Sequence, residues 1–316
     1  MSHTFLSSLA LFSAVLFSLS FPASAQNYTP KLTEHGQPDL RGVWNFSSRT
    51  PLERPERFGE IEFLQDVDRA TLNARPTRGG SAVAYPSRMI GAYNGYWNDT
   101  NELQISGRTS LITHPLNGRI PPVRDGVHVQ LGGDITTDVD FGESRPVRYT
   151  HGGIGRTGPE DRGLSERCLV FVSGPPLLTG YYNNHIQIFQ NADHVVLLIE
   201  MGWDARIVSL EEKPHIDSSI KQWSGDSRGY WDGNTLVVET RNFSEKVGSL
   251  SLRGIAYGNA TDRLLIERFT PIAAGVLEYE FTVDDPTTFT DKIVGNSSMT
   301  SVEDSIYEFA CHSGNY

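Results

Sequence analysis

The sequence predicts an all-β fold, built as an antiparallel barrel or double barrel with one short helix and long loops. Alternating apolar and polar runs recur roughly every ten residues in the C-terminal half, with turn residues between them. No helix-length crossover separates these runs, so neighbouring strands are expected to pair as antiparallel meanders. The expected strands cover residues 169–173, 185–190, 195–201, 205–209, 235–241, 250–257, 264–270, 276–283 and 307–310.

The N-terminal half carries weaker patterns. A first strand is expected over residues 40–44. In the segment 50–87, which is rich in Pro, Arg and Glu, residues 60–74 have the one plausible helical pattern, with apolar side chains on one side. Residues 113–165 lack strong periodicity, which is typical of an irregular functional region or of a disordered linker. We expect one β-rich domain over residues 26–316, or two barrel halves with a boundary near residue 165.

The first 25 residues have the pattern of an export signal. Residues 9–21 form an apolar run, and Ala23-Ser24-Ala25 is a small-x-small cleavage site before Gln26. No later apolar run approaches the roughly 18 residues of a membrane helix. The mature chain is therefore expected in the periplasm or outside the cell, without a membrane span.

The net charge and the number of cysteines limit the expected binding partners and the expected cellular compartment. The net charge is −11 and the basic residues are scattered, so neither nucleic acid nor an anionic membrane is expected as a partner. The chain has two cysteines, Cys168 and Cys311. Export favours a disulfide between them; two buried free thiols, or a catalytic or metal-binding thiol, are the alternatives.

Residues 222–240 form the most informative stretch of the chain. Asp226 and Arg228 lie on a polar, Gly-punctuated turn between Trp223 and Trp231. The tight turn 232–234 and an alternating strand follow, which is a hairpin signal. Asp226 and Arg228 either serve a ligand or form a salt bridge that fixes the turn.

A second group of ionisable residues has spacing suited to a site inside a barrel. Asp204 and Arg206 are two apart, so they share one face of a strand. If Ala205 and Ile207 face outward, the pair faces inward, either as a ligand clamp or as a structural salt bridge. The opposite register would expose the pair.

Histidines supply the candidate proton-transfer groups. His185 follows Tyr182 and Asn183, and His312 follows Cys311. A histidine side chain is well suited to proton transfer near neutral pH. A surface turn would look the same, and His151 and His215 are weaker candidates in irregular segments.

Two resemblances bear on the fold. Gly42-Val43-Trp44 on a first strand is similar to the Gly-x-Trp opening of lipocalins, in which the Trp closes the barrel floor. The motifs at residues 36–44, 118–122, 166–168, 204–207, 225–240, 279–286 and 307–312 together resemble a large group of exported bacterial proteins of unknown function. That resemblance implies export and a shared fold, but no activity. Trp203 and Ser313 depart from its pattern, which has a histidine and an acidic residue there.

The absent motifs favour chemistry without a cofactor. The sequence has no Gly-x-Ser-x-Gly elbow, Gly-rich nucleotide loop, His-Glu-x-x-His or Cys-x-x-Cys motif, so neither a redox cofactor nor zinc proteolysis is expected. No metal is expected, and a site of scattered His, Asp and Glu residues is the alternative. We expect an acid/base enzyme of the isomerase, cyclase, hydratase or lyase type, acting on a hydrophobic or phenolic small molecule. The alternative is a lipocalin-like carrier. The expected catalytic residues are His185, Asp204, Arg206 and His312, and the expected substrate-binding residues are Trp44, Tyr182, Asn183, Trp223, Arg228 and Trp231.

Overall fold

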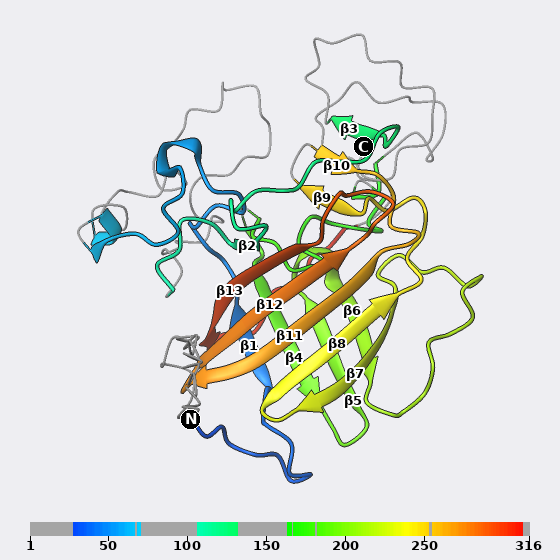
Figure 1. Ribbon diagram of the computed structural model, residues 1–316. Coiled ribbons are helices and arrows are strands. Elements are labelled where there is room, and N and C mark those ends of the chain that lie inside the picture. Colours follow the sequence, from blue (N-terminus) through cyan, green and yellow to red (C-terminus); the bar gives the residue numbers. More distant parts are fainter. Residues whose placement is uncertain are drawn as a thin grey trace, which may run out of the picture.

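A closed β-barrel forms the body of the protein (Figure 1). The computed structural model describes residues 28–66, 68–70, 106–131, 163–165, 167–180, 182–252 and 255–311. The ring closes because β1 (Gly42–Asn45) pairs with both β4 (His185–Gln190) and β13 (Ile293–Val302). The ring continues from β4 through β5 (His194–Ile199), β6 (Asp204–Ser209), β7 (Asp226–Asp232), β8 (Thr235–Arg241), β11 (Leu264–Ala273) and β12 (Val276–Asp284). The predicted all-β barrel is confirmed.

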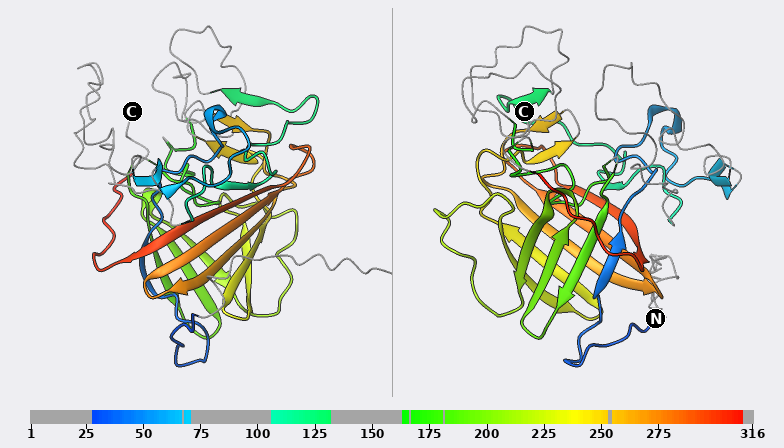
Figure 2. Two further views of the ribbon diagram at one scale, coloured as in Figure 1. Left: turned by 60° about the vertical axis from the view of Figure 1, so that its left-hand side comes forward. Right: turned by 180° about the vertical axis from the view of Figure 1, so that it is seen from behind.

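Smaller elements lie outside the ring. β2 (Ile112–His114) adds to the free part of β13. A three-stranded sheet of β3 (Val129–Leu131), β10 (Ile255–Tyr257) and β9 (Leu250–Leu252) lies beyond one end of the barrel (Figure 2). Two short 3-10 helices, Glu56–Phe58 and Met201–Trp203, interrupt the loops. In the described part of the chain, no helix is long and apolar enough to cross a membrane.

One strand pair corrects the prediction of a wholly antiparallel barrel. β6 and β7 run parallel, with Val208 opposite Ser227. Parallel neighbours need a crossover of about a dozen residues or more, and residues 210–225 supply it as a loop on the outer side of the barrel. Figures 1 and 2 show this crossover loop standing out from the barrel wall. Asp226 and Arg228 therefore lie on a strand, not on the predicted turn.

Other local predictions also differ from the structure. Residues 169–173 and 307–310 are turns or irregular segments instead of strands. Residues 60–65 of the predicted helix are not helical, since Phe63 bridges Arg108 and the Leu64 N–H donates to Gly107. Helical residues begin at 66, and residues 67 and 71–74 lie outside the described residues. So do the predicted export signal, His151 and His312.

Side chains fill the interior of the barrel. Every second residue of β5 is buried, and so is every second residue from Leu265 to Phe269 on β11. Trp44 joins this core, and its indole N–H donates to the carbonyl of Leu40 at 2.9 Å. The two pockets considered below therefore lie at the wall and at one end of the barrel, outside the packed interior.

Candidate functional site

A pocket of about 570 Å³ opens between the crossover loop and the strands β7 and β8. We call it the side pocket. β6 ends at Ser209, while β7 continues to Asp232. The crossover loop therefore lies beside the last part of β7, where no β6 residue pairs with it. The lining from the loop is Leu210, Glu211, Glu212, Lys213, Pro214 and His215, and the lining from the strands is Arg228, Gly229, Tyr230, Trp231 and Glu239.

His215 and Asp226 form the central contact of this pocket. Nδ1 of His215 lies 2.7 Å from Oδ2 of Asp226, which also accepts the N–H of Ile216 at 3.2 Å. Nη2 of Arg228 lies 3.3 Å from the other oxygen of Asp226. Asp226 is 8% exposed. Its carboxylate is held in place because both oxygens accept from donors. An acceptor at Nδ1 places the ring proton on Nδ1 and leaves Nε2 without one.

A second carboxylate faces the other ring nitrogen. Nε2 of His215 lies 3.4 Å from Oε1 of Glu239. Nε of Arg241 donates to the same oxygen at 2.6 Å. The register of β7 and β8 explains this cluster, because Arg228 pairs with Glu239 and Asp226 pairs with Arg241 on the outer face. An imidazole between two carboxylates is suited to accept and hold a proton.

One further group can donate to a ligand in the side pocket. Arg228 is anchored through Nε to the carbonyl of Pro214, and its side chain stays 24% exposed. The buried indole N–H of Trp231 has no hydrogen-bond partner among the described residues. Trp231 and the 58% exposed Tyr230 give the pocket aromatic walls. The side pocket thus combines a proton acceptor, hydrogen-bond donors and apolar surface.

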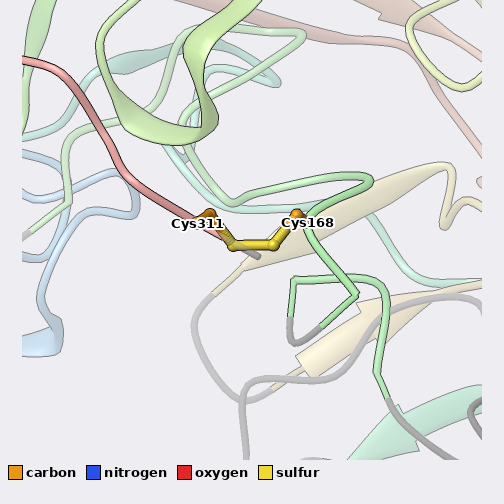
Figure 3. The surroundings of a disulfide bond; sticks show 2 residues. All are labelled: Cys168 and Cys311. Atoms are coloured by element: carbon orange, nitrogen blue, oxygen red, sulfur yellow. A yellow bond between two sulfur atoms is a disulfide. The ribbon is translucent and has the colours of Figure 1, made fainter. Parts of the chain in front are cut away.

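A second pocket, of about 230 Å³, lies at the end of the barrel where β5 ends and β6 begins. We call it the mouth pocket. Asp204 lines it and accepts a hydrogen bond from Ser224 at 2.5 Å. Its outer wall includes Cys168, which is bonded to Cys311 across a sequence separation of 143 residues (Figure 3). The predicted disulfide is confirmed, and it ties the C-terminal segment to the loop that lines this pocket.

His185 lies on the outer face of the barrel, away from both pockets. Its Nδ1 lies 2.8 Å from Oε2 of Glu200, whose other oxygen accepts the N–H of Tyr307 at 3.2 Å. Burial acts to raise the pKa of Glu200, but hydrogen bonds from His185, Tyr307 and Asn183 outweigh it and the pKa is lowered. This cluster holds the segment that leads to Cys311 against the barrel.

Arg206 lies inside the barrel, with Ala205 and Ile207 facing outward as the predicted register requires. Its Nη1 donates to Glu267 at 2.7 Å, and the hydroxyl of Tyr279 donates to the same carboxylate at 2.8 Å. Burial, followed by the charge of Glu267, raises the pKa of Tyr279 well above its usual value, so the phenol stays protonated as a donor. Arg206 therefore forms a salt bridge in the interior, but with Glu267 and not with Asp204.

The predicted site residues therefore do not share one pocket. Arg228 and Trp231 line the side pocket, and Asp204 lines the mouth pocket. Trp44 and Arg206 lie in the interior, and Trp223 packs against the core. Tyr182 is 44% exposed, Asn183 and His185 belong to the outer cluster at Glu200, and His312 lies outside the described residues.

Sequence reasoning undervalued the residues that do converge. His215 was a weaker candidate in an irregular segment, and Glu239 was one position within the expected strand 235–241. The overlooked signal was the alternation of Asp226, Arg228 and Tyr230 with Ser227, Gly229 and Trp231, which is a strand pattern. With β7 recognised, residues 210–225 have the length of a parallel crossover, which brings His215 beside Asp226.

Fold and site together define a closed mixed β-barrel with a histidine–carboxylate pocket on its outer wall. Compared with protein-family models, with curated proteins and with solved structures, the chain matches none.

Proposed function

We propose that the protein is an acid/base enzyme that needs no cofactor and acts on a small molecule in the side pocket. The observation that supports this most is His215, whose Nδ1 is held by Asp226 at 2.7 Å while the ring borders a pocket of about 570 Å³. A histidine oriented by a buried carboxylate is a recurrent arrangement for proton transfer. The proposal moves the catalytic centre from His185 and Asp204 to His215.

The proposed reaction begins with a proton transfer to Nε2 of His215. The proton leaves a C–H or O–H bond of the substrate, and the electron pair of that bond stays on the substrate as an enolate or phenolate. Asp226 and Glu239 balance the positive charge that the ring gains. Arg228 donates to the oxygen that becomes negative.

The second step determines the reaction type. Return of the proton to a different carbon gives an isomerisation. Expulsion of a leaving group by the electron pair, with the proton passed to that group, gives an elimination. Neither step needs an oxidant or a reductant. The walls formed by Leu210, Pro214, Tyr230 and Trp231 suit a hydrophobic or phenolic substrate.

The test is metabolite profiling with matched histidine variants. Wild-type protein is incubated with a metabolite extract and the mixture is compared by mass spectrometry. We expect a metabolite that wild type, His185→Gln and the exposed control His35→Gln all consume, and that His215→Gln consumes about 10²–10⁴ times more slowly. A metabolite that is retained but unchanged indicates the carrier function instead. Full turnover by His215→Gln contradicts the assignment of the base.

We also propose that the chain is exported and that residues 1–25 are removed on the way. The Cys168–Cys311 disulfide supports this, because disulfides persist mainly in oxidising compartments. So does the resemblance to exported bacterial proteins at the motifs given above. Mass spectrometry of the protein from a periplasmic or secreted fraction should find Gln26 at its N-terminus. An intact Met1 in that fraction would contradict the cleavage site.

A further inference from the structure

The mouth pocket has a wall of strained backbone. Cys168, Gly202 and Trp203 all have left-handed φ angles, of 57°, 85° and 56°. For the two non-glycine residues this conformation costs roughly 1–2 kcal/mol each, and such strain concentrates at ligand-binding segments. Gly202 is required by space as well, since a Cβ there would lie 2.4 Å from the ring of Phe171. The disulfide at Cys168 holds one side of this wall.

Asp204 is the one charged residue among those that line the mouth pocket. Its Oδ2 accepts the hydroxyl proton of Ser224, but no described cation lies within ion-pair distance of its carboxylate. Arg206, two residues along the same strand face, is bound to Glu267 through Nη1. Arg206 attracts Asp204 electrostatically without being in ion-pair contact with it, so the partly enclosed carboxylate still favours a cation in direct contact.

Ser173 supplies a second, independent feature of this pocket. It is 1% exposed, and its Oγ has no hydrogen-bond partner in the described part of the chain. Leaving a buried hydroxyl unpaired costs about 1–3 kcal/mol, which a ligand that hydrogen-bonds to it would recover. Trp203, 42% exposed in the pocket wall, adds an aromatic surface beside these polar groups.

We propose that the mouth pocket binds the primary ammonium group of a small organic amine, with Asp204 as its counter-ion. An ammonium group has three N–H donors and no acceptor. Asp204, Ser173 and Ser224 offer acceptor oxygens, since the hydroxyl proton of Ser224 is already given to Asp204. Trp203 packs against the organic part of the amine and stabilises the cation through its ring face. This site is independent of the side pocket and of its proposed reaction.

Size and charge define the ligand further. The volume of about 230 Å³ equals that of roughly eight water molecules at ~30 Å³ each, enough for an amine the size of benzylammonium. Carboxylates and phosphates are repelled by Asp204. A quaternary ammonium keeps the charge but has no N–H to donate, so it loses the bonds to the serines.

The experiment is calorimetric titration of the oxidised mature chain with three matched probes: benzylammonium, benzyltrimethylammonium and benzyl alcohol. We expect benzylammonium to bind at least about tenfold more tightly than benzyl alcohol, with benzyltrimethylammonium between them. Asp204→Asn should weaken benzylammonium at least about tenfold, and Ser173→Ala about three- to tenfold. Asp193→Asn, on the turn at the other end of β5, is the control and should leave the affinity unchanged.

Several outcomes would overturn the proposal. Equal affinity for the ammonium and the alcohol, no binding of any probe, or unchanged affinity in Asp204→Asn each contradicts it. If Asp204→Asn does not fold, Ser173→Ala tests whether the ammonium binds here. This variant should fold, because the Ser173 hydroxyl makes no hydrogen bond to a described residue. Full affinity in Ser173→Ala, together with equal binding of the primary and quaternary amines, excludes the hydrogen-bonded ammonium.

Discussion

Arg206 and Glu267 form an ion pair across the interior of the barrel, although β7 and β8 separate their strands in the sheet. Arg206 is 3% exposed and Glu267 is fully buried. Tyr279 donates to the second oxygen of Glu267 and itself accepts the N–H of Leu177, so the network reaches from the barrel wall to the loop that covers the mouth. The pair therefore connects β6 and β11 through the apolar core of the barrel.

Removing one partner of this pair should be costly. Arg206→Met leaves Glu267 buried without its cation, and we expect the free energy of unfolding to fall by about 3–5 kcal/mol. Urea unfolding of the oxidised protein measures it. Arg268→Met is the control on β11, because Arg268 pairs with the 60% exposed Asp232 and should lose less than about 1 kcal/mol. Equal losses in the two variants would mean that the interior pair contributes no more than a surface pair.

The disulfide should contribute strongly to stability. Replacing both Cys168 and Cys311 by serine opens a link across 143 residues, and we expect a loss of about 2–5 kcal/mol in the free energy of unfolding. The mouth pocket should lose its amine affinity as well, since Cys168 lines it. Urea unfolding and titration with benzylammonium measure the two effects. The activity proposed for the side pocket should persist, because neither cysteine lines that pocket.

Stability should depend on pH through Glu200. Its folded-state pKa is below the usual 4.5, so its ionised form stabilises the protein above that pH. This contribution is lost as the pH falls from 4.5 through the folded-state value. Glu200→Gln should cost about 1.5–3 kcal/mol at neutral pH, and the difference from wild type should shrink in acid. Unfolding measured across the acidic range checks this, with the exposed Glu303→Gln as control. A constant difference at all pH values would contradict the linkage.

Asp226 should fix the tautomer of His215. In wild type we expect the ring proton on Nδ1, because Asp226 accepts there at 2.7 Å. Asp226→Asn keeps the shape of the side chain but offers an amide that can donate, so the Nε2–H tautomer should rise. Nitrogen NMR of the histidine ring measures the two forms. Turnover in the side pocket should fall about 10²–10⁴-fold. An unchanged spectrum would show that Asp226 does not position the ring.

The sequence was sufficient to predict most of the barrel. Alternation marked β4, β5, β6, β8, β11 and β12 to within a few residues, because one face of each strand packs inward. β13 was missed for a physical reason. Its inward residues Gly295 and Ser297 lie opposite Phe281 and Tyr279 and must be small to make room for those rings. A Cβ at Gly295 would lie 2.3 Å from the Phe281 ring. The large apolar side chains at these positions therefore belong to β12. β13 has small residues there, so its own sequence lacks the apolar alternation that marks a strand.

The site was harder to predict than the fold. The inward face shared by Asp204 and Arg206 followed from spacing, but their partners Ser224 and Glu267 come from distant segments. His215 and Asp226 meet because two strands run parallel, which depends on the tertiary fold more than on local pattern. Local sequence thus predicted which residues share a strand face more readily than it predicted which residues of distant segments lie together.

The closure of β1 between β4 and β13 places a constraint on the order of folding. Trp44 pairs with Ile186 on one side and with Ser301 on the other, so the ring stays open until the segment around residue 300 has been delivered. Contacts this distant in sequence form slowly, since the closure entropy must be overcome before they stabilise anything. If the chain folds from its N-terminus as it emerges, β1 can pair with β4, but the other edge of β1 stays unpaired until β13 is available. A sheet with an unpaired edge is the state most exposed to aggregation and proteolysis. For this chain, the last strand to arrive converts an open sheet into a barrel without edges.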